Sequence, residues 1–495
     1  MDLKQLPFLP LNYFYRSFTR GQKGIFIALF SVLAFAAAAF LFAVNMPWFW
    51  APVVQEAPDV KAANVVAETL RHQYRSMELA LPAFRVWVMY AAGPLLPGRF
   101  PSLVFWLMQG LAWAGILGAL TLIRTRWIYA GYLLYALFIH FSGIARVLYP
   151  DDTFRLLEFA LIMTGLGFAY VFQMNMLRWD LVWRCLIFAV YHTLLIGAAL
   201  WRGGWPALDG MAAGSIGYLI FLSLIFLLFI AKEPTNLVVI AATHHKEEAN
   251  RRGLPWVIAG FSLLMLLEFF WLLDFLNLGI SFSGLSRGIK PMYLVAISAI
   301  AMVFTSQNQY PQVKEAINSQ AAYSLLLLGW GILSLSFWFW GSASGDHIFP
   351  FAFERLAVLF FFFVGAGHIF FLLTNHLTLF RRNISLFYLI NQGTRFGLII
   401  VWLLGMVGII IAEGSEKWKT IPMLIYSAQV QQADHLMKTG DSAGAIAAYE
   451  NAIAFIPAGR KAHYNLGALM ISDRERGNEG LAHYQEAGRL GLDWG

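Results

Sequence analysis

Long apolar runs, separated by short polar connections, make up most of the chain. The first run, residues 24–44, contains no charged side chain and is long enough to cross a hydrocarbon layer of about 30 Å. We therefore predict an all-α fold, in which residues 24–412 form a polytopic membrane helix bundle of about eleven spans. The predicted spans lie near residues 24–44, 102–123, 127–149, 154–175, 183–201, 212–231, 255–277, 290–306, 320–340, 351–373 and 396–412.

The connection over residues 45–101 is much longer than the others and is expected to form an outer loop. It begins with a cluster of aromatic residues and contains an amphipathic stretch at residues 60–81. Its last part, residues 83–98, is apolar but is interrupted by an arginine and two prolines. We interpret this part as an interfacial or re-entrant helix, because a charge is unfavourable at the centre of a bilayer. If it crossed the membrane, the side assigned to every later element would be inverted.

A different pattern begins after the last span. Residues 413–419 are rich in charge and lead into a tail of ordinary polarity. In the tail, a Gly-Asp turn is followed by two alanines and a tyrosine at helical spacing, and then by a proline. Small alanines let two helices approach each other, and the tyrosine fills the groove between them. The first unit comprises Gly440, Asp441, Ala445, Tyr449, Ala452 and Pro457, and the second repeats the pattern at Tyr484 and Ala487.

Over about residues 426–491 the tail resembles the tetratricopeptide repeat family, with two repeat units. The resemblance implies two helical hairpins and a groove that binds peptides or helices. It suggests Ala433, Tyr449, Asn465 and Tyr484 as partner-binding residues. Because such an array usually needs about three repeats to be stable, we expect the tail to dock on the outer face of the membrane domain, on a partner, or on another copy of itself.

The composition agrees with a membrane protein. Hydrophobic residues make up 59% of the chain and charged residues 13%, which is about half the charged fraction of an ordinary globular domain. The formal charge of +7 does not indicate nucleic-acid binding, because the lysines and arginines lie mostly in short connections between apolar runs. The single cysteine, Cys185, lies inside an apolar run, so a disulfide framework and a cysteine metal cluster are excluded. We predict no metal site and no cofactor.

The distribution of basic residues predicts the orientation of the chain. Four basic residues precede the first span and further ones lie in alternate connections, so residues 1–23 are predicted to be cytoplasmic. An odd number of spans then places residues 413–495 on the opposite face, which is the periplasm for a bacterial inner-membrane protein. Residues 232–253 are expected to form a solvated cytoplasmic loop. The adjacent His244 and His245 in this loop would point to different faces of a helix and are poor co-ligands for a metal.

Ionisable residues inside the predicted spans are the candidates for chemistry, because charge is costly in a bilayer. In one interpretation they form ion pairs that set the helix register, such as Arg155 with Glu158 one turn along. In the other they line a cavity that opens outwards, where arginines bind a phosphate or carboxylate and Asp274 or Glu268 acts as a base. The ligand-binding candidates Arg146, Arg155, Glu158, Glu354 and Arg355 lie in the outer part of the spans, as does Asp274. Glu268 and His140 lie deeper, His192 lies mid-span and His368 lies nearer the cytoplasm.

The function predicted from these features is that of a scaffold or assembly subunit of an envelope or membrane complex. Its partners would be other membrane or periplasmic proteins and lipids, in a homo- or hetero-oligomer, and no nucleotide-binding, zinc-protease or serine-hydrolase motif occurs. One alternative is an enzyme acting on a lipid-linked substrate, because the outline resembles that of multi-span polyprenyl-phosphate glycosyltransferases, with Asp59 as the nearest acidic residue in the outer loop. The other is a transporter, which would need ionisable groups in both halves of the spans, and the cytoplasmic half looks bare.

Overall fold

The structure, a computed structural model, is helical throughout its regular elements. It describes residues 18–45, 99–123, 126–149, 154–174, 176, 179–243, 249–275, 290–313, 317, 319–343, 348–381, 398–414, 419–471 and 476–492. Within these residues, seven helical segments are long and apolar enough to cross a membrane. The predicted all-α fold with several membrane-spanning helices is therefore confirmed.

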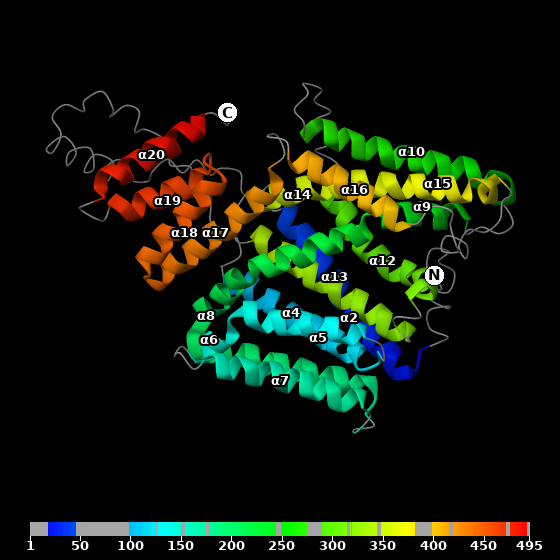
Figure 1. Cartoon of the computed structure of the whole chain (residues 1–495), viewed down its shortest axis with the longest axis horizontal. Helices are drawn as coiled ribbons and strands as arrows, with labels where there is room; N and C mark the ends of the chain where they lie inside the picture. Colours follow the sequence, from blue (N-terminus) through cyan, green and yellow to red (C-terminus); the bar gives the residue numbers. More distant parts are fainter. Residues whose placement is uncertain are drawn as a thin grey trace.

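The membrane bundle consists of helices that run roughly along one common direction (Figure 1). At its centre lies α13, which is buried along almost its whole length and packs against α2 and α4. The elements of the bundle are α2 (Arg20–Asn45), α4 (Arg99–Leu120), α5 (Trp127–Ser142), α6 (Ile144–Leu148), α7 (Phe154–Gln173), α8 (Leu181–Ile230), α9 (Glu233–Thr243), α10 (Ala249–Phe275), α12 (Pro291–Val313), α13 (Gln320–Ala343), α14 (Ile348–Phe360), the π-helical turn η4 (Phe361–Gly365), α15 (Ala366–Arg381) and α16 (Leu398–Glu413).

The contact between α4 and α13 shows how the sequence allows such close packing. Gly329 on α13 faces α4, and a methyl group in place of its hydrogen would lie 3.0 Å from the carbonyl oxygen of Ala112. The amide of Gln109 donates hydrogen bonds of 3.0 Å to the carbonyl of Leu333 and of 2.8 Å to the hydroxyl of Ser336. A small residue and a buried amide therefore join the two helices, as expected for helices that associate in lipid.

The described helices follow the predicted spans, with two differences. Two predicted spans, 183–201 and 212–231, lie on the single element α8, which is interrupted at Gly204, where φ is +65° and ψ is −165°. Three other predicted spans correspond to the shorter apolar helices Ile128–Ser142, Pro291–Val303 and Leu403–Glu413. Most of the long outer loop, including residues 83–98 and Asp59, and the pair His244 and His245 lie outside the described residues.

The expected solvated loop at residues 232–253 is wrong for much of its length. Residues Glu233–Thr243 form α9, and α10 begins at Ala249. Pro234 lies in the first turn of α9, where its missing N–H and its fixed φ are favourable. The polar start of α9 is buried, because the helix packs against α10 and α12.

The tail consists of two helical hairpins, α17 (Thr420–Thr439) with α18 (Ser442–Phe455) and α19 (Arg460–Ile471) with α20 (Gly477–Leu492). The predicted turn is present between the first two helices. Gly440 has a φ of +85°, which favours glycine, and the carboxylate of Asp441 accepts a hydrogen bond of 2.9 Å from the backbone N–H of Gly444. In the second hairpin, Gly467 and Gly480 bring α19 and α20 together, since a methyl group on either would lie 2.9 Å from the carbonyl oxygen of the other.

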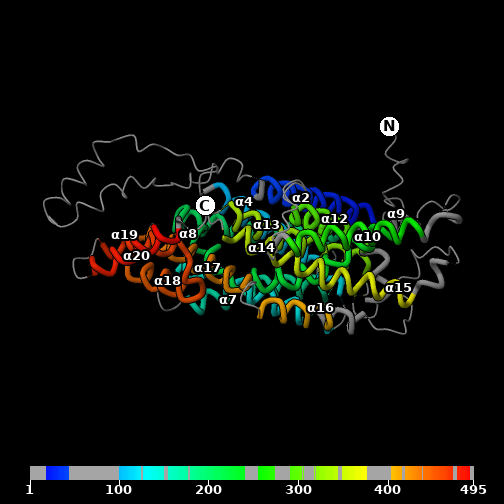
Figure 2. Tube along the Cα trace, turned by 90° about the horizontal axis from the view of Figure 1, so that it is seen from above, coloured from blue at the N-terminus to red at the C-terminus, as the bar shows by residue number. Residues whose placement is uncertain are grey.

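The tail docks on the membrane bundle through one helix. Helix α17 packs against both α8 and α14, and Leu424 of α17 belongs to the hydrophobic core of the bundle. Gly210 of α8 leaves room for the ring of His435 on α17, which would meet any larger side chain there. The tail lies at one end of the bundle and the N-terminal end of α2 at the other (Figures 1 and 2).

Candidate functional sites in the bundle and at the tail

The residues predicted to line an outward-facing cavity fall into two separate groups. Helices α6 and α7, which carry Arg146, Arg155 and Glu158, lie on one side of the bundle, whereas α14, with Glu354 and Arg355, lies on the other (Figure 1). The described members of the predicted set therefore do not line one common cavity. Asp274 lies near the end of α10.

The contacts in the first group differ from those predicted. Glu158 accepts a hydrogen bond of 2.8 Å from the Nδ1 atom of His140 on the neighbouring helix α5, instead of pairing with Arg155. Arg155 is exposed, and Arg146 places its guanidinium 5.1 Å from the ring centre of Phe154. The predicted pair between Arg155 and Glu158 is wrong, because a histidine on another helix lies closer to the carboxylate.

In the second group, Arg355 contributes to the joint between bundle and tail. Its guanidinium lies 4.5 Å from the ring centre of Phe351 and is attracted by the carboxylate of Glu413 at the end of α16. Glu413 accepts hydrogen bonds of 3.1 Å from the backbone N–H groups of Thr420 and Ile421. These groups form the N-terminus of α17, where a negative charge is favourable. Glu413 and Arg355 thus connect the last predicted span to the tail.

A cluster of buried polar side chains lies where α8 gives way to α9. The Oε2 atom of Glu233, a fully buried residue, accepts hydrogen bonds of 2.5 Å from the hydroxyl of Thr305 and of 3.2 Å from the amide nitrogen of Asn236. This orients the amide of Asn236, so that its oxygen accepts a hydrogen bond of 3.0 Å from Nε2–H of His368. Lys232 is also buried and is attracted by the adjacent carboxylate of Glu233. We name these five residues the polar cluster.

The polar cluster lies deeper along the bundle than the groups near the tail. His368 is fourteen residues beyond Glu354 on the continuous run α14–η4–α15, a helical distance of about 21 Å. The cluster therefore places three buried ionisable side chains, those of Lys232, Glu233 and His368, in the part of the bundle away from the tail. A Lys-Glu-Pro sequence within an otherwise apolar stretch is the signal that could have indicated a buried helix start.

Glu268 of α10 lies beside this cluster and is fully buried. Neither of its carboxyl oxygens has a hydrogen-bond partner among the described residues. A methyl group on Gly365, at the end of the π-helical turn, would lie 3.5 Å and 3.6 Å from these oxygens and 3.4 Å from the carbonyl oxygen of Ala231. The carboxyl of Glu268 and the carbonyl of Ala231 therefore face the same small space beside Gly365. Single π-turns in helices occur frequently at functional sites.

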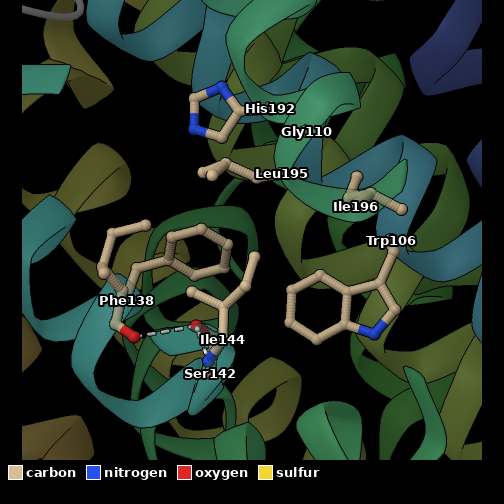
Figure 3. Close-up of a pocket in the computed structure, with 9 residues that line it drawn as sticks. Trp106, Gly110, Phe138, Ser142, Ile144, His192, Leu195 and Ile196 are labelled. Carbon is tan, nitrogen blue, oxygen red and sulfur yellow. Dashed lines mark hydrogen bonds between the residues drawn. The ribbon is translucent and has the colours of Figure 1, made fainter. Parts of the chain in front are cut away.

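His192 of α8 lines a small apolar pocket between α4, α5 and α8 (Figure 3). Its Nδ1–H donates a hydrogen bond of 2.7 Å to the carbonyl of Phe188, and its Nε2 has no hydrogen-bond partner among the described residues. The pocket is lined by Trp106, Phe138 and Ile196, and has room for about one water molecule. It is too small to hold a substrate, so His192 serves the packing of the bundle.

In the tail, the partner-binding candidates belong mainly to a buried network. Ala433 and Tyr449 are fully buried in the core of the first hairpin. The hydroxyl of Tyr449 donates a hydrogen bond to Asp434, and the amide of Asn465 donates to Asp434 at 3.1 Å and to Tyr449 at 2.9 Å. Lys461 pairs with the same carboxylate at 2.6 Å. Burial, and then the carboxylate of Asp434, raise the pKa of the Tyr449 phenol.

These contacts stabilise the tail from the inside. A partner would meet other residues, among them Tyr464 and Tyr484, whose rings contact each other at a centroid distance of 5.1 Å. Tyr464 is 44% exposed and Tyr484 is partly exposed. Of the four predicted partner-binding residues, Asn465 and Tyr484 are partly exposed, and the burial of Ala433 and Tyr449 reflects packing.

Comparisons with known proteins identify no relative: no family model matches the chain, and neither the curated proteins nor the solved structures contain a significant match.

Proposed function

We propose that this protein is a scaffold or assembly subunit of the bacterial inner membrane, which presents two tetratricopeptide-like hairpins to a partner protein in the periplasm. In this proposal the chain crosses the membrane about eleven times, with α8 crossing twice around Gly204 and the N-terminus in the cytoplasm. The observation that carries the proposal is the asymmetric docking of the tail. Helix α17 packs on α8 and α14 of the bundle as well as on α18, while α18, α19 and α20 follow one another away from the bundle (Figure 1).

The joint supports a rigid presentation of the hairpins. Leu424 is buried in the core of the bundle, Ile348 of α14 packs against the core of the tail, and Glu413 caps α17. A docked first helix replaces the third repeat that such arrays usually need, because it covers one end of the short array. The outer hairpin then offers exposed apolar side chains, of which Tyr464 and Ile471 on α19 are the largest. Aromatic side chains of this kind are frequent anchors in protein interfaces.

The test is the isolation of the full-length protein from its native membrane in mild detergent, with the mass of the assembly as the measurement. We expect a discrete complex that is lost in a double variant, Tyr464→Ala with Tyr484→Ala. The matched control is Tyr129→Ala, which removes a 71% exposed tyrosine from the membrane bundle and should leave the complex intact. A complex unchanged in the double variant would contradict the proposal. So would a reporter fused after Trp494 that is active only in the cytoplasm.

The polar cluster favours a second candidate function, which is transport of a solute or ion. A helix interrupted inside the bundle, here between α8 and α9, exposes backbone groups that can bind a ligand, and transporters place their sites at such interruptions. Uptake into vesicles that contain the purified protein tests this candidate. Loss of uptake in Glu233→Gln, with retention in Glu354→Gln, is the expected result for a site at the cluster.

A further inference from the structure

Among the described residues, Glu268 is a fully buried carboxyl with no hydrogen bond and no ion pair. An ionised carboxylate without hydrogen bonds is strongly disfavoured in an apolar interior, so the burial of Glu268 favours its protonated form. A protonated carboxyl can donate one hydrogen bond, and the carbonyl of Ala231 faces the same space. Ionisable residues that are kept inside the bilayer usually belong to a pathway or a relay.

The charged groups on the elements packed against α10 do not neutralise Glu268. Helix α9 contributes Glu233, with Lys232 just before it, and α15 contributes His368. Helix α14 contributes Glu354 and Arg355, and the guanidinium of Arg355 lies over the ring of Phe351. None of these side chains forms an ion pair with Glu268 in the described part of the chain.

The polar cluster lies about one helical turn away from the space beside Gly365. His368 follows Gly365 by three residues, and Asn236 follows Ala231 by five. Because Nε2–H of His368 donates to Asn236, the nitrogen that can take up a further proton is Nδ1. The resulting imidazolium would be held by the hydrogen-bonded chain from Asn236 to the carboxylate of Glu233.

We propose that Glu268 is an intramembrane proton-binding site, which is filled and emptied through His368 and the polar cluster. When the site empties, the O–H bond of the carboxyl breaks and an N–H bond forms at Nδ1 of His368, which leaves a carboxylate and an imidazolium that attract each other. The proton then leaves His368 to water. The π-helical turn supplies the space for this exchange, because Gly365 has no side chain to fill it. This site is independent of the proposed role of the tail.

The test is infrared difference spectroscopy of the full-length protein in phospholipid vesicles, with water and deuterium oxide as the probe. We expect a carbonyl band of a protonated buried carboxyl that shifts in deuterium oxide and is absent from Glu268→Gln. Glu354→Gln is the control and should keep the band. In His368→Phe, which keeps a ring beside Phe371, the hydrogen–deuterium exchange of the band should slow by about tenfold or more, because the nearest acid–base group is gone.

A further variant keeps the proposal falsifiable if Glu268→Gln does not fold. Gly365→Ala places a methyl group in ordinary van der Waals contact with the carboxyl, so it should fold and shift the frequency of the same band. A band that survives in Glu268→Gln, or one whose frequency is unchanged in Gly365→Ala, overturns the assignment to Glu268. Exchange at the wild-type rate in His368→Phe overturns the route through the polar cluster.

Discussion

Two acidic residues, the partly buried Asp434 in the tail and the fully buried Glu268 in the bundle, have opposite surroundings. Asp434 accepts hydrogen bonds from Tyr449 and Asn465 and pairs with Lys461. Glu268 is more deeply buried and has no hydrogen-bond partner among the described residues. A satisfied carboxylate specifies the packing of its neighbours, whereas an unsatisfied one lowers the stability of the fold around it. The comparison indicates that Asp434 stabilises the fold and that Glu268 does not.

The largest effect is expected when the carboxylate of Asp434 is removed. Asp434→Leu leaves the hydroxyl of Tyr449, the amide of Asn465 and the ammonium of Lys461 without their acceptor, and should destabilise the tail by about 2–4 kcal/mol. Limited proteolysis of the full-length protein measures this as faster cleavage within residues 420–492. Glu450→Leu, which removes an exposed carboxylate from the same hairpin, should cleave at the wild-type rate. If Asp434→Leu and the wild type are cleaved at the same rate, Asp434 does not stabilise the tail.

Replacing Glu268 by an apolar residue should stabilise the protein, whereas the same kind of substitution at Asp434 should destabilise it. Glu268→Met keeps a similar volume and replaces an unsatisfied carboxyl by an apolar group, so we expect the bundle to gain about 1–3 kcal/mol of stability. The measurement is the thermal unfolding of the full-length protein in detergent, monitored by a signal that reports on the bundle. A loss of stability similar to that of Asp434→Leu would mean that both acids are structural, and the comparison would fail.

A smaller effect is expected at the joint that connects the two regions. Glu413→Gln retains the size of the side chain but removes the negative charge at the N-terminus of α17 and beside Arg355, at a cost of about 1 kcal/mol. Hydrogen exchange at the backbone amides of Thr420 and Ile421 should become faster, while the amides of α19 keep their protection. Faster exchange across the whole tail would show instead that the joint supports the fold of both hairpins.

The smallest expected effect is a dependence of the stability of the second hairpin on pH, which arises from His483. Nε2–H of His463 donates to the carbonyl of Pro457 at 2.9 Å, so its Nδ1 accepts a hydrogen bond of 2.9 Å from Nδ1–H of His483. Burial, and then the ring of His463, lower the pKa of His483 below its ordinary value of 6.5, against the smaller opposing attraction of Glu450 and Glu479.

A histidine with a lowered folded-state pKa binds protons more weakly in the folded than in the unfolded chain. Its contribution to stability is therefore complete above the unfolded pKa and is lost as the pH falls below about 6.5. Because His483 is only partly buried, the loss should be small. Limited proteolysis of the second hairpin at pH values of about 7.5 and 5.5 measures it, and in His483→Gln the difference between the two pH values should shrink. An unchanged difference would assign the pH dependence to other groups.

Much of the helical architecture could be predicted from local patterns. The length of an apolar run determines whether a helix can cross a bilayer, and the Gly440–Asp441 turn needs only a residue that tolerates a positive φ and one that caps the next helix. These are properties of neighbouring residues, so a single sequence contains them. The predicted pair of Arg155 with Glu158 used the same local logic and was wrong, because His140 approaches from a different helix.

The sequence by itself determined that the chain is a multi-pass helical membrane protein, that its tail folds into hairpins, and that Glu268 lies deep in a span. Only the tertiary structure decided which polar groups meet. Thr305 is 72 residues from Glu233, and His368 is 132 residues from Asn236, yet each pair is joined by a hydrogen bond inside the bundle. Such contacts depend on which faces of distant helices pack together, and many arrangements of similar apolar helices satisfy the same local pattern. The packing around Gly365 therefore decided that Glu268 faces the π-turn and a carbonyl instead of a counter-charge.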